Sequence, residues 1–106
     1  MKPILLSMTG VVLLGAGSPS PRLTSHTIET RGMVYRPAEF TAAVGDTVLW
    51  INRDPVPHTA TATGENGWDT GEIAPGDTGR LVVTAKMASD YTCQLHPNMR
   101  GKLSAR

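Results

Sequence analysis

The sequence carries at positions 93–99 the stretch Cys93-Gln94-Leu95-His96-Pro97-Asn98-Met99. This stretch holds the only cysteine of the chain, one of its three histidines and a methionine, spaced three positions apart. A thiolate, an imidazole and a thioether are soft or borderline ligands, and together they suit copper better than zinc, calcium or magnesium. The spacing therefore indicates a copper site.

These three side chains reach one metal ion only if the segment forms a loop. A straight helix turns about 100° per residue and would spread positions 93, 96 and 99 around its surface. Pro97 favours the loop, because it lacks an N–H and moves the preceding residue out of the helical region. A trigonal copper site also needs a second histidine from elsewhere in the chain, and His58 is the candidate.

His58 follows a stiff, largely apolar loop. Pro55 and Pro57 fix φ and so reduce the entropy lost in holding the histidine at one position, as a preorganised metal site requires. A histidine after a proline in a loop is commonly only exposed to solvent. The ligand interpretation of His58 therefore depends on its partnership with the Cys93 loop.

Cys93 has several possible roles. A protein with one cysteine forms no internal disulfide, so in an oxidising compartment the residue is a free thiol, an intermolecular bridge or a metal ligand. The alternative without chemistry is a buried cysteine that packs as a small apolar residue. His96 and Met99 at fixed offsets favour the metal ligand.

The rest of the chain predicts an all-β fold. With 106 residues and 40% hydrophobic content, it is long enough for one compact domain and too short for two. Eleven glycines and eight prolines separate short runs of β-forming residues. We expect strands within 27–35 (one strand or a strand pair), 40–44, 47–52, 59–63, 79–84, 91–93 and 101–104. This pattern indicates a Greek-key β-sandwich or barrel.

The strand at 47–52 is the strongest, and we expect Val48 and Trp50 to face the core. Residues 85–90 have room for one short helical turn or a bend. The candidate ligands fall at one end of such a domain, because His58 begins a strand and the Cys93 loop connects two later strands. This arrangement places the site on loops held by a rigid scaffold.

The N-terminus predicts export. Lys2 precedes an apolar stretch within residues 4–14, and small residues follow, as in a signal peptide over residues 1–18. The apolar stretch is shorter than the roughly 20 residues of a spanning helix, so we expect no membrane span in the mature chain. Residues 19–26 read as a flexible lead-in with a solvated His26, and residues 27–106 as the folded domain. The expected location is periplasmic or otherwise exported.

The charge gives little guidance about partners. Ten basic and nine acidic side chains leave a formal net charge of +1, which argues against nucleic acid or an anionic membrane as partner. We expect a monomer, and its partners must be inferred from the candidate copper site.

Two segments carry a family resemblance. They are Tyr91-Thr92-Cys93-Gln94-Leu95-His96-Pro97-Asn98-Met99-Arg100-Gly101-Lys102 and Val44-Gly45-Asp46-Thr47-Val48-Leu49-Trp50-Ile51-Asn52, the second followed by Pro57-His58. The first resembles the copper loop of the cupredoxin family of small type 1 (blue) copper proteins, closest to amicyanin and plastocyanin. The second resembles the strand that leads to the first copper histidine in that family. The match covers nearly everything from residue 27 to residue 104.

The resemblance implies an eight-stranded Greek-key sandwich that binds one copper ion, Cu(I) or Cu(II). The implied ligands are His58, Cys93 and His96 in the equatorial plane and Met99 as a weak axial ligand. It also implies that His96 reaches the surface within an apolar patch, so that a redox partner protein docks near it.

The sequence departs from the family at three positions near these motifs. The family often has asparagine directly after the first copper histidine, where this chain has Thr59. A glycine and an aromatic residue often precede the Tyr-x-Cys stretch, where this chain has Met87 and Ser89. These changes affect the surroundings of the ligands and leave their number unchanged.

The first functional hypothesis is a one-electron carrier that cycles between Cu(I) and Cu(II) and is not an enzyme. Four protein ligands leave no open position for substrate, and no catalytic residues are expected. The alternative is a periplasmic copper-binding or copper-delivery protein with the same ligands, although the chain lacks the exposed Met or His clusters typical of soft Cu(I) transfer. A Cys/His hydrolase is remote, because one tight loop positions no triad.

Overall fold

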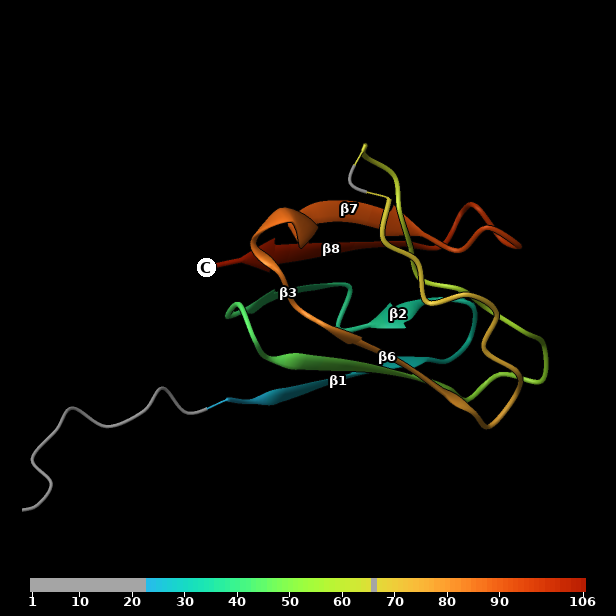
Figure 1. Cartoon of the computed structure of the whole chain (residues 1–106). Coiled ribbons are helices and arrows are strands. Elements are labelled where there is room, and N and C mark those ends of the chain that lie inside the picture. Colours follow the sequence, from blue (N-terminus) through green and yellow to red (C-terminus); the bar gives the residue numbers. More distant parts are fainter. Residues whose placement is uncertain (1–22, 66) are drawn as a thin grey trace, which may run out of the picture.

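The computed structural model describes residues 23–65 and 67–106. The signal peptide expected at residues 1–18 and the first part of the lead-in lie outside this range. Within it, two four-stranded sheets face each other (Figure 1). Their strands are β1 (Ser25–Thr30), β2 (Tyr35–Arg36), β3 (Glu39–Ala42), β4 (Thr47–Asn52), β5 (Thr61–Ala62), β6 (Thr78–Val82), β7 (Ser89–Thr92) and β8 (Arg100–Ala105). The predicted all-β Greek-key sandwich is confirmed.

The chain crosses repeatedly between the sheets. One sheet has the order β2-β1-β4-β6 and the other β3-β8-β7-β5. β1 runs parallel to β4, and β3 runs parallel to β8, while the remaining pairs are antiparallel. Among the described strands, β1 with β2 and β7 with β8 are the two antiparallel pairs of consecutive strands, and longer loops connect the others.

The strand limits agree best where the β-forming run is continuous. β4 covers the expected 47–52. The region 27–35 belongs to a strand pair, but β1 begins at Ser25 and β2 ends at Arg36, so the last two residues of the expected lead-in are in β1. The strand expected at 59–63 is wrong in extent, because only Thr61–Ala62 pairs with β7. One short 3₁₀ turn, η1 (Ala85–Met87), occupies part of 85–90. In the described part of the chain, no helix has the length and apolar character to cross a membrane.

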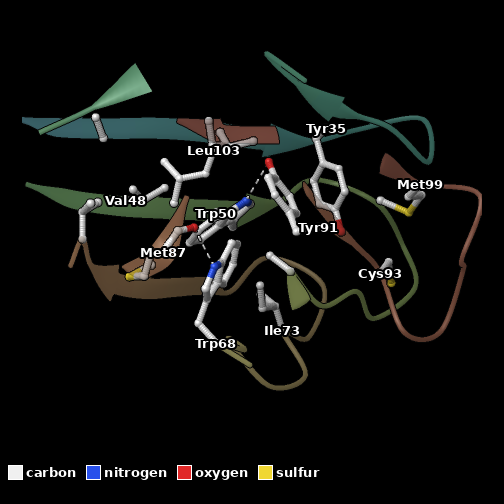
Figure 2. Close-up of a cluster of buried hydrophobic side chains, with 14 residues drawn as sticks. Tyr35, Val48, Trp50, Trp68, Ile73, Met87, Tyr91, Cys93, Met99 and Leu103 are labelled. Carbon is white, nitrogen blue, oxygen red and sulfur yellow. Dashed lines mark hydrogen bonds between the residues drawn. The ribbon is translucent and has the colours of Figure 1, made fainter. Parts of the chain in front are cut away.

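Val48 and Trp50 face the core as expected, and both are completely buried. Trp50 packs against Trp68 and Tyr91, with ring centroids 5.7 Å apart in each pair (Figure 2). Trp50 Nε1–H donates to the Tyr91 hydroxyl at 3.3 Å. Opposite Tyr91 in the β7–β8 pair lies Gly101, where a Cβ would stand 2.3 Å from the Tyr91 ring. The position of the Tyr91 ring therefore leaves no space for a side chain at residue 101.

The expectation of a solvated His26 is wrong. The residue lies in β1, its side chain is 21% exposed, and Nε2 lies 2.8 Å from Asp46 Oδ2. The Asp46 carboxylate also accepts hydrogen bonds from the backbone N–H groups of Thr24 and Ala43. The hydrogen bond from His26, followed by those two backbone donors, lowers the Asp46 pKa to about 2. His26 thus helps to anchor the start of β1 to the turn before β4.

Candidate metal site

The two loops that carry the predicted ligands meet at one end of the sandwich. The loop after β4 and the loop between β7 and β8 lie at the same end in Figure 1. Cys93 and Met99 lie together at one end of the core cluster, beside Tyr35 (Figure 2). The sequence expectation that the ligands gather on loops at one end is consistent with this placement.

The backbone of His58 is held by the segment around Ile73. His58 N–H donates to the Ile73 carbonyl at 3.1 Å, and Ile73 N–H donates back at 2.7 Å. The buried Asn52 side chain adds a clamp, because Nδ2 donates to the carbonyls of Val56 at 2.8 Å and Ile73 at 2.9 Å. The last residue of β4 therefore fixes the loop that carries the histidine.

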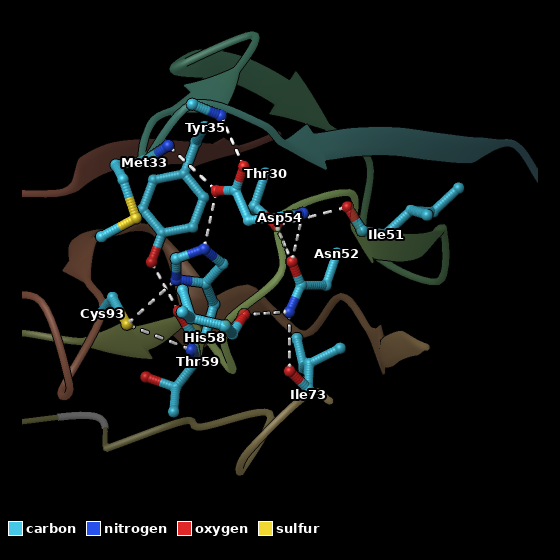
Figure 3. A network of polar contacts seen from close by, with 12 residues as sticks. Thr30, Met33, Tyr35, Ile51, Asn52, Asp54, His58, Thr59, Ile73 and Cys93 are labelled. Atoms are coloured by element: carbon cyan, nitrogen blue, oxygen red, sulfur yellow. Dashed lines mark hydrogen bonds and ion pairs between the residues drawn. The ribbon is translucent and has the colours of Figure 1, made fainter. Parts of the chain in front are cut away.

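The His58 ring is oriented by a carboxylate. His58 is fully buried, its Nε2 lies 2.8 Å from Asp54 Oδ2, and its Nδ1 lies 3.8 Å from Cys93 Sγ (Figure 3). An ionised carboxylate only accepts hydrogen bonds, so the neutral ring carries its proton on Nε2. The lone pair of Nδ1 then faces the thiol, which is the tautomer that a metal ligand needs.

Asp54 is a residue that the sequence did not single out. Its carboxylate also accepts hydrogen bonds from Gly32 N–H at 2.7 Å and Met33 N–H at 2.9 Å. These two residues have φ of +67° and +64°, the left-handed turn that aims both N–H groups at Asp54. Burial opposes ionisation, but hydrogen bonds from Met33, Gly32 and His58 hold the Asp54 pKa below its ordinary value. The only available signal was its position four residues before His58.

Cys93 is completely buried and is contacted by Thr59. Thr59 N–H donates to Cys93 Sγ at 3.3 Å (Figure 3), and Gln94 N–H donates to Thr59 Oγ1 at 2.9 Å. Thr59 thus ties the two loops together.

His96 and Met99 occupy the turn that follows the cysteine. His96 N–H donates to the Cys93 carbonyl at 3.3 Å, and Met99 N–H donates to the His96 carbonyl at 2.9 Å. These bonds close the segment into a turn, in agreement with the loop that Pro97 led us to expect. The His96 ring lies edge-on to the His58 ring with a centroid distance of 5.1 Å, and Met99 is 2% exposed.

The donor set suits a soft metal ion. Two ligands bound at ~2.0 Å for nitrogen and ~2.3 Å for sulfur, 120° apart, lie about 3.7 Å from one another. The separation of His58 Nδ1 and Cys93 Sγ, 3.8 Å, is close to this distance. Within residues 23–65 and 67–106, no three His, Cys, Asp or Glu side chains form a group that could hold a metal ion, so the structure does not bring His58, Cys93 and His96 together as one set. The structure thus pairs His58 with Cys93 and places His96 and Met99 on the adjoining turn.

Tyr35 closes the site on the core side. Its hydroxyl donates to the Thr59 carbonyl at 2.5 Å, and the residue is 2% exposed. Burial, and then the proximity of Cys93 and Tyr91, raises the pKa of Tyr35 above its ordinary value. The phenol therefore stays protonated and supports the backbone of Thr59. Tyr35 is thus the second residue of the site, after Asp54, that the sequence did not reveal.

The surface at this end is apolar. Leu95, beside half-buried His96, is 44% exposed, and the tip of the β1–β2 hairpin exposes Met33 at 40% and Val34 at 43%. Of the other apolar residues in these loops, Val56 and Pro57 are half-buried and Pro97 is exposed. Leu95 and Pro97 are sequence neighbours of His96, so apolar surface adjoins that ring.

Comparisons with known proteins identify the family of the chain. A family model described as copper binding proteins of the plastocyanin/azurin family matches residues 23–105. Amicyanin of Paracoccus denitrificans is 35% identical over 80 residues, which cover 72% of this chain and 61% of that protein. Amicyanin of Paracoccus versutus is 37% identical over 75 residues, which cover 67% of this chain and 57% of that protein. The chain thus spans less than two thirds of these curated relatives.

Solved structures show the same similarity. A mutant amicyanin in its Cu(I) form has a TM-score of 0.70 and 30% identity, with coverage of 77% of this chain and 82% of that chain. Another amicyanin mutant, in its oxidised state, has a TM-score of 0.70, 31% identity and the same coverage, 77% and 82%.

Proposed function

The chain belongs to the copper binding proteins of the plastocyanin/azurin family, and from this we propose that it is a one-electron carrier with a type 1 copper centre. The proposed ligands are His58, Cys93 and His96, with Met99 as a weak axial ligand. The observation that carries the proposal is the 3.8 Å separation between His58 Nδ1 and Cys93 Sγ, with the nitrogen lone pair facing the sulfur.

When bound there, copper would supply a reversible one-electron couple between Cu(I) and Cu(II). The chain's own residues prepare the site. Asp54 holds the His58 ring in the ligand tautomer, and Thr59 N–H directs a hydrogen bond at the Cys93 sulfur. Cys93, His58 and Met99 are each at most 2% exposed, so water has little access to the donor atoms.

These features support a carrier rather than an enzyme. His58, Cys93 and Met99 are all buried, so a substrate has little access to their donor atoms. Ligands held in place also need little rearrangement when the metal changes its oxidation state, and here hydrogen bonds join His58 to Ile73 and Gln94 of the Cys93 loop to Thr59. We therefore assign no catalytic residue.

We propose that redox partner proteins dock at the apolar surface around His96. Leu95 and the hairpin tip supply apolar area, and the exposed Arg100 and Lys102 of β8 follow the ligand loop and offer a basic rim. We also propose a monomer that is exported to the periplasm or beyond, with residues 1–18 as its signal and a copper domain that begins with β1 at Ser25, two residues before the expected boundary at residue 27.

Voltammetry of the copper-loaded protein, together with competition by a Cu(I) chelator, tests the carrier. We expect one reversible one-electron wave and slow loss of copper to the chelator. Rapid loss of copper without a reversible wave would favour copper delivery. His58→Gln should abolish the wave, whereas His26→Gln, which keeps a hydrogen-bonding group beside Asp46 and lies outside the site, should preserve it.

A further inference from the structure

A chain of hydroxyl groups joins the Cys93 loop to a carboxylate on the surface. Gln94 N–H donates to Thr59 Oγ1 at 2.9 Å, and Thr59 Oγ1 lies 2.9 Å from Thr61 Oγ1. Thr61 Oγ1 donates to Asp69 Oδ1 at 2.8 Å. Asp69 is exposed, while Thr61 is half-buried and Thr59 is 4% exposed, so the chain runs from solvent to the interior.

The donors in this chain have one consistent direction. Each threonine hydroxyl has a single proton to donate, and a carboxylate only accepts. The Thr61 proton points to Asp69, so Thr61 must accept from Thr59. Thr59 Oγ1 then donates its proton to Thr61 and uses a lone pair to accept the hydrogen bond from Gln94 N–H. Each bond polarises the next, and a carboxylate at the far end makes Thr59 Oγ1 a better acceptor.

The backbone holds the chain of hydroxyls in place. Thr61 pairs with Thr92 in the β5–β7 ladder and forms an isolated bridge with Asp69. Asp69 Oδ1 also accepts from Gly71 N–H at 2.9 Å, which orients the carboxylate. The short strand β5 therefore brings the surface carboxylate into line with the ligand loops.

Thr59 links the hydroxyl chain to the Cys93 sulfur, because it forms two hydrogen bonds with adjacent residues of the Cys93 loop. Its hydroxyl holds Gln94 N–H, and its own N–H donates to Cys93 Sγ at 3.3 Å. If the hydroxyl loses its acceptor, it must turn to find another, and the loop loses one of these two attachments.

We infer that Thr61 and Asp69 are positioning residues for the ligand loop of Cys93, acting through Thr59. In this chain, a relay of two hydroxyls and a carboxylate takes the place of the single asparagine side chain often found in the family. A residue on the surface thereby sets how firmly the loop is held and, on the proposed copper function, contributes to the reduction potential.

The first test measures amide hydrogen exchange of Gln94 in the copper-free protein, so it does not depend on the proposed copper function. Thr61→Val should raise the exchange rate at least threefold, and Thr61→Ser, which keeps the hydroxyl, should restore it. Thr63→Val is the matched control, because Thr63 donates only to the Asp90 carbonyl in an exposed position. Asp69→Ala removes the acceptor at the surface end of the chain and should raise the exchange rate of the Gln94 amide at least twofold.

The second test measures the reduction potential of the copper-loaded variants and rests on the proposed function. A looser loop weakens the Thr59 hydrogen bond to sulfur, which leaves more charge on the thiolate and favours the oxidised state. Thr61→Val should shift the redox equilibrium threefold toward oxidation, which lowers the potential by about 28 mV, since tenfold is 59 mV for one electron. Gln94 exchange in Thr61→Val and Asp69→Ala equal to that in Thr63→Val would overturn the inference. Altered exchange in a protein without a copper couple would refute the proposed function alone.

Discussion

Asp54 Oδ2 lies 2.8 Å from His58 Nε2, on the opposite side of the imidazole from Cys93. The same carboxylate holds the N–H groups of Gly32 and Met33 at the tip of the β1–β2 hairpin. One buried charge therefore fixes both a proposed copper ligand and the apolar surface where we propose that partners dock.

Removal of this charge should raise the reduction potential. Asp54→Asn keeps the size of the side chain but takes away a negative charge that stabilises the more positive, oxidised site. We expect an increase on the order of 50 mV by voltammetry. Glu39→Gln, which neutralises an exposed carboxylate on β3, is the control and should change the potential little. Equal potentials in the two variants would show that the Asp54 charge does not act on the metal.

Replacement of the axial ligand should also raise the potential. Met99→Leu removes the weak thioether bond and leaves His58, Cys93 and His96 in place, so copper should stay bound with a potential higher by on the order of 60 mV, a tenfold change. Met87→Leu is a matched control, because Met87 is also buried but belongs to η1. A potential unchanged from that of wild type would remove Met99 from the ligand set.

Gly101 should tolerate no side chain. Gly101→Ala places a Cβ 2.3 Å from the Tyr91 ring, which must move and disturb its contact with Trp50. Overpacking of this kind costs about 1–3 kcal/mol of unfolding free energy, measured by urea denaturation of the copper-free protein. Gly64→Ala, whose Cβ would meet only Ser89 Oγ at 3.5 Å, should cost much less. Equal losses would mean that the close Tyr91 approach is not a constraint.

The Asp46 carboxylate should make the free energy of unfolding depend on pH in the acidic range. Its pKa in the folded protein is about 2, against an ordinary value of 3.8. A depressed pKa means that the ionised form stabilises the fold, so this contribution is complete above about pH 4 and is lost as the pH falls toward about 2. Urea denaturation of the copper-free protein between pH 5 and pH 2 should show this loss. Asp46→Asn should be less stable at pH 5 and should flatten the dependence, and an unchanged slope would contradict the assignment.

Much of the fold was predictable because its signals are local. The run Thr47–Asn52 forms β4 as expected, and Gly and Pro positions separated most of the remaining strands. Thr59–Thr63 was harder, because its alternation of small residues is a weak signal. Only Thr61–Ala62 pairs with β7, while Thr59 turns its N–H toward Cys93 and its hydroxyl toward Gln94.

The ligand types could be predicted from sequence, but their surroundings could not. Cys93, His96 and Met99 lie on one loop, whereas the contacts of Asp54 with Gly32 and Met33 join residues 22 and 21 positions apart. Such contacts exist only once the hairpin packs against the loop. His26 was misjudged for the same reason, since its partner Asp46 lies 20 positions away.

The optical spectrum of the purified protein without residues 1–18, after addition of one equivalent of Cu(II), tests the central claim most directly. A thiolate bound to Cu(II) should give a strong band in the red part of the visible spectrum, which ascorbate bleaches and which Cys93→Ser lacks. A folded protein that stays colourless with Cu(II), or a band that survives in Cys93→Ser, would contradict a copper centre built on Cys93.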